Sequence, residues 1–335
     1  AMPQLTLDHA ERLTKETLLR AGACESMAVA AAQHLVKAEA QGIASHGLIR
    51  APQYANHLQT GRVNGQAKPI LVSGSTAAQR VDAQHGLSFE ACSLAVDTAI
   101  KLAQVNGIGL VGVFNSHHAG VLVDQMRPVA DAGMIGLAFA NTPSAMPAAG
   151  GKTAFFGTNP ISAIFPREHH SPLLIDMSLS EAARGKVIAA SQAGKPIPLG
   201  WALDANGAPT TDAKAALAGS MLPLGGGAKG SLLAMMIEVM VGALIGSHFS
   251  HEAMSYFDES TDPPSMGQCF IVINPRALAG SVSYYQRFES LLTDMLADDG
   301  VRLPGALRYE REAKAQSDGV YISDDLFSKL KQAAG

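Results

Sequence analysis

The chain has 335 residues, of which 47% are hydrophobic and 16% charged, and its formal net charge is −4. This composition excludes a disordered chain and allows a large core divided into two subdomains. No basic block occurs in the sequence, so we expect neither nucleic-acid binding nor docking to a membrane surface.

Cysteine use and hydropathy narrow the class of protein further. Cys24, Cys92 and Cys269 are scattered and lack metal-binding spacing. We therefore expect small core residues in a reducing, cytoplasmic compartment and no metal. The apolar run 232–245 is interrupted by Glu238 and is too short to span a bilayer, so it predicts a buried helix.

The first 60 residues have the apolar spacing of helices. The spacing predicts three of them, over 6–20, over 25–42 and from Ser45 to about Leu58. Residues 60–65 (TGRVNG) have the composition of a turn. We therefore expect a helical unit at the start of the chain.

From residue 70 onward, strand-like and helical stretches alternate. Strands are predicted within 71–82 and over 108–114, 135–140, 161–165, 173–176 and 268–274. Helices are predicted over 89–105, up to about residue 132, and over 180–192, 231–245, 280–297 and 323–334. Residues 194–212 form a meander rich in proline and glycine, and 303–312 an irregular basic segment. This alternation indicates an α/β core.

The motif Ser45-His46-Gly47-Leu48-Ile49-Arg50 lies in the third predicted helix. His46 and Arg50 are four residues apart and would share one helical face. Imidazole exchanges protons near neutral pH, and guanidinium binds a carboxylate through two parallel hydrogen bonds. The pair would suit a small carboxylate substrate. Taken alone, however, the motif fits better with a helix start capped by Ser45 and carrying solvated side chains.

Nucleotide-binding patterns of the common kinds are missing from the sequence. A Rossmann fingerprint, a P-loop and the G-x-S-x-G elbow of serine hydrolases are all absent. Gly225 to Gly230 (GGGAKG) instead places glycines and Lys229 at a helix start, which suits a phosphate, although a plain glycine-rich loop is the alternative. Arg302, Arg308 and Arg311 could bind a second phosphate, such as the 2′-phosphate of NADP, or form a solvated charged loop.

Polar groups also follow two of the predicted strands. His118 and Gly120 stand at a strand-to-helix junction, where a cofactor could approach closely, or where Ser116 caps the helix over buried imidazoles. Asp176 ends a buried strand and could accept a hydrogen bond from a ribose or simply cap the next turn. The cations Arg184 and Lys186 would ordinarily be solvated.

Together these stretches resemble one family, the malate/L-lactate dehydrogenase-like NAD(P)H-dependent oxidoreductases that lack a Rossmann fold. The resemblance covers nearly the whole chain. It rests on the motifs Ser45-His46-Gly47 with Arg50, Asn115–His118, Phe156–Pro160, Asp176–Ser178, Ala183–Lys186, Gly200–Asp204, Gly227–Gly230 and Pro304-Gly305 with Arg308-Tyr309.

The family resemblance implies a mostly antiparallel sheet in a cofactor domain over 81–274. Residues 1–80 and 275–335 would form a helical domain for substrate binding and dimerisation, in a homodimer. Within the family, the chain looks most like the reductases of cyclic ketimine carboxylates, which make L-pipecolate and L-proline. The pointers are Asn115–His118 and Gly246–Ser250. Lys186 departs from the acidic residue of the piperideine-type reductases and matches the dehydrogenase members.

The resemblance also implies residue roles. His46 would supply a proton, oriented by Ser45 and influenced by Lys186, and Arg50 would hold the substrate carboxylate with help from Arg184 and Thr158. The implied cofactor is NADPH, with NADH possible, held by His118, Ala119, Gly120, Val121, Leu122, Asp176, Met177, Ser178, Ala228, Lys229, Gly305, Arg308, Tyr309 and Arg311. The substrate would be a cyclic imino acid or a 2-oxo acid. The alternatives are a dehydrogenase of malate, lactate or ureidoglycolate, and a non-catalytic nucleotide- or metabolite-binding protein.

Overall fold

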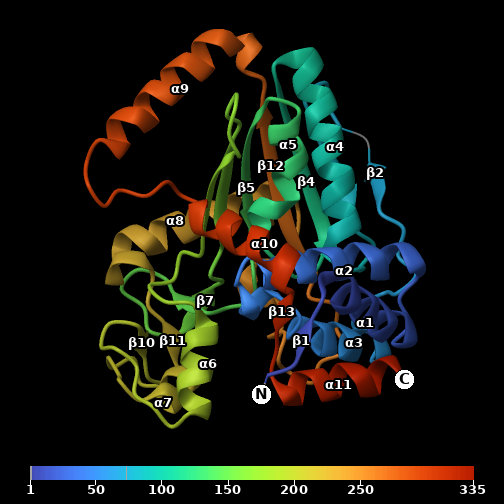
Figure 1. Cartoon of the computed structure of the whole chain (residues 1–335). Helices are drawn as coiled ribbons and strands as arrows, with labels where there is room; N and C mark the ends of the chain where they lie inside the picture. Colours follow the sequence, from blue (N-terminus) through green and yellow to red (C-terminus); the bar gives the residue numbers. More distant parts are fainter. Residues whose placement is uncertain (1, 73) are drawn as a thin grey trace.

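The centre of the molecule is a seven-stranded sheet (Figure 1), in a computed structural model that describes residues 2–72 and 74–335. The strand order is β2-β3-β4-β12-β5-β8-β9. The strands are β2 (Ile70–Val72), β3 (Ala78–Asp82), β4 (Ile108–Ser116), β5 (Ile135–Ala140), β8 (Ile161–Phe165), β9 (Leu173–Met177) and β12 (Met266–Ile273). Every neighbouring pair is antiparallel except β3 and β4, which run parallel. The predicted α/β class is confirmed.

Each face of the sheet is covered by helices because the central strands are apolar on both sides. On β12, Phe270 and Val272 join one core cluster and Cys269 joins the other, as the two-residue period of a strand requires. The first face is covered by α4 (Ser88–Asn106), η2 (Leu122–Met126) and α5 (Arg127–Asp131). Alanines on α4, such as Ala95 and Ala99, are fully buried and let the helix pack closely against the sheet.

The second face is covered by α8 (Ala228–Glu238) and the π-helical turn η4 (Val239–Leu244). The predicted helix 231–245 thus begins three residues earlier and changes to π geometry within its length. The prediction that it is buried is wrong for one side, because Leu232, Met235 and Val239 face solvent while Ala234, Ile237 and Val241 face the sheet. The same core cluster continues into a lobe of short elements. These are β6 (Met146–Pro147), β7 (Ala154–Phe156), α6 (Arg184–Gln192), β10 (Ala202–Leu203), α7 (Ala213–Ala218), β11 (Ser220–Met221), η3 (Leu224–Gly226) and η5 (Ser250–Glu252).

The N-terminal helices pack beneath the sheet together with the last helix (Figure 1). They are α1 (Leu7–Arg20), α2 (Glu25–Ala40), α3 (Arg50–Gln59) and α11 (Asp324–Ala334). The short strands β1 (Gln4–Leu5) and β13 (Val320–Tyr321) pair antiparallel and bring both ends of the chain together. The predicted helices 6–20, 25–42 and 323–334 are confirmed to within two residues. The division into domains at residues 80 and 275 stays a prediction.

The third predicted helix is wrong in its first turn. Residues Ala44–His46 form the 3-10 helix η1, and Gly47 then leaves helical geometry before α3 begins at Arg50. The cause is Glu39, whose carboxylate accepts from the Leu48 N–H at 2.9 Å and takes the space that a Cβ at position 47 would need. His46 and Arg50 therefore do not share a regular helical face.

Two further boundaries differ from the prediction. Residues 303–312 are not irregular, because α10 runs from Ala306 to Asp318 and Pro304-Gly305 precede it rather than end it. The predicted helix 180–192 begins only at Arg184, because Ser180 pairs with Pro223 in an isolated bridge. The helix α9 (Ser281–Leu296), preceded by η6 (Pro275–Ala277), lies away from the N-terminal helices (Figure 1). No helix in the described ranges is long and apolar enough to cross a membrane.

Candidate active site

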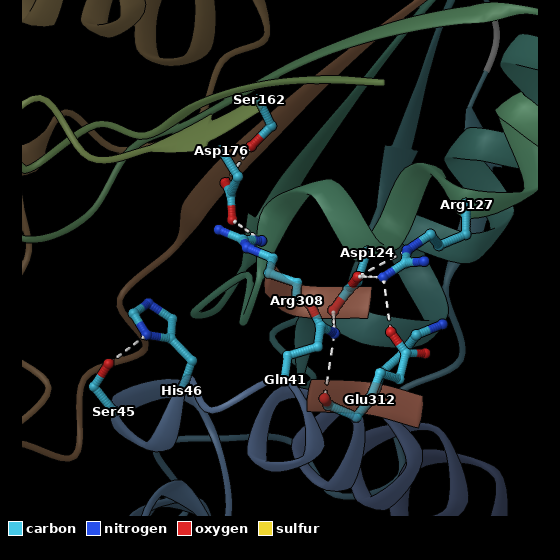
Figure 2. Close-up of polar contacts among 10 residues, drawn as sticks. Gln41, Ser45, His46, Asp124, Arg127, Ser162, Asp176, Arg308 and Glu312 are labelled. Atoms are coloured by element: carbon cyan, nitrogen blue, oxygen red, sulfur yellow. Dashed lines mark hydrogen bonds and ion pairs between the residues drawn. The ribbon is translucent and has the colours of Figure 1, made fainter. Parts of the chain in front are cut away.

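His46 is half-buried and hydrogen-bonded to the preceding side chain. Its Nδ1 lies 2.9 Å from the Ser45 Oγ (Figure 2), and its ring centroid lies 5.2 Å from that of His118. Burial, followed by the positive charges of Arg50 and Arg308, lowers the pKa of His46 to about 4. The imidazole is therefore neutral near pH 7, with Nδ1 engaged and Nε2 left as the proton-exchanging atom.

Arg50 begins α3 directly after the His46 turn. Its Nε donates to the Ser45 carbonyl at 2.8 Å and one terminal nitrogen donates to the Gln53 Oε1 at 2.9 Å. The Phe257 ring centroid lies 5.6 Å from the guanidinium carbon. A guanidinium has more N–H groups than these two bonds use, so the Arg50 fork keeps donors for a carboxylate.

Behind this pair lies a buried cluster of aromatic and histidine rings. The His118 Nδ1 accepts from the Tyr54 hydroxyl at 2.8 Å and from the Gly120 N–H at 3.3 Å, which leaves the proton of the neutral ring on Nε2. The His57 Nε2 donates to the Tyr256 carbonyl at 3.0 Å, and its Nδ1 lies 2.9 Å from the His117 Nε2. Burial lowers the pKa of all three imidazoles, so they too are neutral near pH 7.

The second half of the site is the β9 edge and the start of α10. The Asp176 carboxylate accepts from the Ser162 Oγ and, at 3.0 Å, from an Arg308 terminal nitrogen (Figure 2). Burial raises the pKa of Asp176, and the Arg308 charge opposes that shift. Tyr309 reaches the Pro172 carbonyl at 2.7 Å. The structure therefore brings the predicted Asp176 and Arg308 together, and it places Tyr309 on the segment just before β9.

A polar network behind α10 holds that helix in place (Figure 2). Arg127 bridges Asp124 at 3.0 Å and Glu312 at 3.3 Å, and the other Asp124 oxygen accepts from the Gln41 amide at 2.7 Å. Arg311, in contrast, packs over Gly42 beside the end of α2.

The glycine-rich loop before α8 is open. Gly225 and Gly226 have positive φ, and a Cβ added at either position would have no neighbour within 4 Å. Gly227 caps α8 without a side-chain hydrogen bond, ahead of Ala228 and the exposed Lys229. The Gly225 N–H donates to a Glu181 carboxylate oxygen at 2.7 Å and the Gly226 N–H to the Pro223 carbonyl at 2.8 Å. The N–H groups of the first turn of α8, from Gly227 to Lys229, and the Lys229 cation are therefore what fits a phosphate here. The loop adjoins the segment after Asp176, because the Leu224 N–H donates to the Leu179 carbonyl at 2.7 Å.

The remaining predicted residues divide between the site and its surroundings. Gly185 lies against Ser45, so the start of α6 with Arg184 and Lys186 borders His46. The Lys186 Nζ lies 5.9 Å from the Trp201 ring centroid. Thr158 is tied instead to Thr142 and Leu179. The side chains of Ala119, Val121 and Leu122 are buried. Met177 is exposed at the end of β9, and the Ser178 Oγ lies 3.1 Å from the Ser180 Oγ.

Two parts of the site, Tyr54 and the segment Tyr256-Phe257-Asp258, are not predicted by any sequence motif. Tyr54 is fully buried against His118, and Phe257 lies over Arg50. Aromatic residues make up only 5% of the chain, so two adjacent aromatics in a loop of serine, proline and acidic residues were the available signal. No group of three or more histidine, cysteine or acidic residues within the described residues is arranged to hold a metal.

Comparison with known proteins decides the family. The family model described as malate/L-lactate dehydrogenase matches residues 5–331. The chain belongs to the malate/L-lactate dehydrogenase family. It is thus an oxidoreductase of this family, as the sequence motifs predicted.

Members of the malate/L-lactate dehydrogenase family with different substrates are similar to this chain. The (2R)-3-sulfolactate dehydrogenase (NADP(+)) of Chromohalobacter salexigens is 44% identical over 92% of this chain and 92% of that relative. The Δ1-pyrroline-2-carboxylate/Δ1-piperideine-2-carboxylate reductase of Pseudomonas putida is 36% identical over 97% of this chain and 95% of its own length.

Solved structures give the same division. The sulfolactate dehydrogenase of Methanocaldococcus jannaschii has a TM-score of 0.90 at 31% identity, covering 99% of this chain and 96% of that one. The Δ1-piperideine-2-carboxylate reductase of Pseudomonas syringae has a TM-score of 0.92 at 30% identity, covering 99% of both chains. The fold is therefore common to both activities, and the roles of individual residues stay predictions.

Proposed function

We propose that this protein interconverts a 2-hydroxy acid and its 2-oxo acid with NADP(H), and that the substrate carries a second anionic group. The observation that supports this is the positive charge at His46, where Arg50 and Arg308 both act on the imidazole, together with the start of α6, which carries Arg184 and Lys186 and lies beside Ser45. A carboxylate on Arg50 would leave the α6 cations for a sulfonate or a second carboxylate. The sulfolactate dehydrogenases among the relatives act on such a molecule.

In this proposal, the chain's residues position the substrate and move one proton. Arg50 holds the carboxylate, and its bond to the Ser45 carbonyl fixes the fork beside His46. The neutral His46 Nε2 accepts the hydroxyl proton during oxidation, while Nδ1–H donates to the Ser45 Oγ. During reduction the imidazolium returns the proton to the developing alkoxide. A nicotinamide held at this site would supply the hydride acceptor for oxidation and the hydride donor for reduction at the substrate carbon.

The cofactor would lie between the glycine-rich loop and the β9 edge. The N–H groups of Gly227 to Lys229 at the start of α8, with the Lys229 cation, suit a phosphate, and the paired Asp176 and Arg308 suit a ribose and its 2′-phosphate. The backbone of His118 to Leu122 would complete the contact. We favour NADPH over NADH because Arg308 keeps N–H donors beyond those bonded to Asp176.

Reduction of a cyclic ketimine carboxylate is the second candidate function. It is favoured by the paired histidines His117-His118 and by the pyrroline- and piperideine-carboxylate reductases among the relatives. A ketimine protonates on nitrogen before hydride transfer, so His46 would have less to supply. The cations around the site weigh against this candidate, because an iminium substrate would be repelled by them.

A spectrophotometric panel separates these functions. NADPH or NADH consumption would be followed with sulfopyruvate, oxaloacetate, pyruvate and the two cyclic ketimines, and NADP⁺ reduction with the matching hydroxy acids. We expect the dianionic 2-oxo acids to have the highest kcat/KM. Turnover of ketimines alone would establish the second candidate, and turnover of none would favour a non-catalytic nucleotide- or metabolite-binding protein.

We further propose a homodimer in the cytoplasm. Support comes from apolar side chains exposed on α8 and η4, among them Leu232, Met235 and Val239 at 60%, 51% and 49%. The reduced Cys92 and Cys269 fit the compartment. Light scattering after size exclusion should give a particle of twice the chain mass. In Met235→Glu the particle mass should fall to that of a single chain.

A further inference from the structure

The segment of residues 254–262 meets the candidate site through three consecutive side chains. The Tyr256 ring centroid lies 5.6 Å from that of His118 and 5.0 Å from that of His117. Phe257 lies over Arg50, with its ring centroid 5.6 Å from the guanidinium carbon. Asp258 follows it, and its negative charge opposes the lowering of the Arg184 pKa by burial. The 254–262 segment therefore forms one wall beside Arg50.

This wall is held by an arginine outside the site. Arg62 is fully buried, and its guanidinium donates to three main-chain carbonyls of the segment. The bonds run from Nε to Asp262 at 3.1 Å and from the two terminal nitrogens to Ser255 and Met254 at 2.9 Å each. Burying an arginine is costly unless its donors are satisfied, so such a residue is expected where a loop needs a fixed shape.

Two side chains of α3, one in its first turn and one in its last, add two more hydrogen bonds to the wall. The Gln53 amide donates to the Tyr256 carbonyl at 3.2 Å, while its Oε1 accepts from Arg50. The His57 Nε2 donates to that Tyr256 carbonyl at 3.0 Å. Hydrogen bonds thus link Arg50 through Gln53 to the 254–262 segment, and Arg62 holds the main chain of that segment.

We propose that Arg62 is a positioning residue for substrate binding, acting through the 254–262 segment on the orientation of Arg50. By fixing Met254 and Ser255 it sets Phe257 over the guanidinium, which holds the fork in the plane that a carboxylate can meet. Phe257 then limits the size of the group that the substrate carries next to its carboxylate. This inference rests on Arg50 as the carboxylate-binding residue of the proposed function.

The test measures binding of oxalate to the NADPH-loaded protein by calorimetry, since oxalate mimics a 2-oxo acid without turnover. Arg62→Lys should weaken oxalate binding about 10- to 100-fold through misplacement of Arg50, while the Kd for NADPH stays unchanged. Arg80→Lys is the control for the substitution itself, because Arg80 also donates to a main-chain carbonyl, that of Ile245, but lies exposed and, in the part of the chain that the structure describes, makes no hydrogen bond or ion pair with the 254–262 segment. Oxalate binding should not change in that control.

A second variant separates positioning from a general loss of structure. Phe257 is 57% exposed, so Phe257→Leu should fold normally and weaken oxalate binding. In the double variant with Arg62→Lys, the two losses should not add, because both act through one contact. Hydrogen exchange should also rise in residues 254–262 of Arg62→Lys.

The outcomes of this test are distinct. Additive losses, or unchanged oxalate affinity in Arg62→Lys, would overturn the role of Arg62 and leave the proposed function intact. Failure of the unmodified protein to bind oxalate would instead overturn the carboxylate site itself, and the role of Arg62 with it.

Discussion

Replacing Arg50 by lysine keeps the positive charge beside His46 and removes the planar fork. Lysine cannot bind a carboxylate through two parallel N–H groups, nor donate at once to the Ser45 carbonyl and Gln53 as Arg50 does. Losing one hydrogen bond to a charged group costs about 1.5–3 kcal/mol. The KM for the acid substrate should therefore rise about 10- to 150-fold.

The assay is steady-state oxidation of the hydroxy acid at saturating NADP⁺. Because the fork binds ground state and transition state alike, kcat should change little, and the KM for the cofactor should not change. Arg80→Lys serves again as the control. A KM within about twofold of the unmodified protein, or a loss confined to kcat, would refute Arg50 as the carboxylate-binding residue.

Three further outcomes follow from charge and burial. Oxidation needs neutral His46, whose pKa is about 4, so kcat/KM should be flat above about pH 5 and fall below it. Arg50→Gln removes a positive charge that lowers the His46 pKa, so the fall in kcat/KM should move to higher pH in this variant. An unchanged pH profile would contradict His46 as the proton acceptor. Asp176→Asn should raise the KM for NADPH at least about tenfold with little change in the KM for the acid, and the reverse pattern would contradict a cofactor role. Burial lowers the pKa of His34 from 6.5 to about 4, so the unfolded chain binds a proton on this residue more readily than the folded chain does. The free energy of unfolding should therefore fall as the pH drops from about 6.5 to 4, and this fall should be up to about 3 kcal/mol smaller in His34→Gln. Urea titrations that show equal acid sensitivity in that variant would disprove this.

The sequence predicted most elements because their patterns are local. The apolar strands 108–114 and 135–140 and the alanine-rich helix 25–42 carry their own periodicity. The break at Gly47 depends on the Glu39 carboxylate, which comes from another helix and has no local signal. The α10 helix was hidden by its charged face and by Pro304-Gly305 at its start.

The candidate site was predictable where the motifs are contiguous, as for Ser45-His46 and Asp176–Ser178. Pairings between distant segments were not. Arg308 meets Asp176 across 132 residues, and Arg62 meets Met254 across 192. Such contacts depend on the sheet order that brings the segments together, which a single sequence does not encode in any short pattern.

The role of His46 as the proton-exchanging residue is tested by the turnover of His46→Gln with the best substrate of the unmodified protein, measured alongside NADPH binding. An amide can keep the hydrogen bond to Ser45 but cannot exchange a proton. We expect a loss of about 10²- to 10⁴-fold in kcat/KM for the hydroxy acid with an unchanged Kd for NADPH. Turnover within a few-fold of the unmodified protein would contradict it.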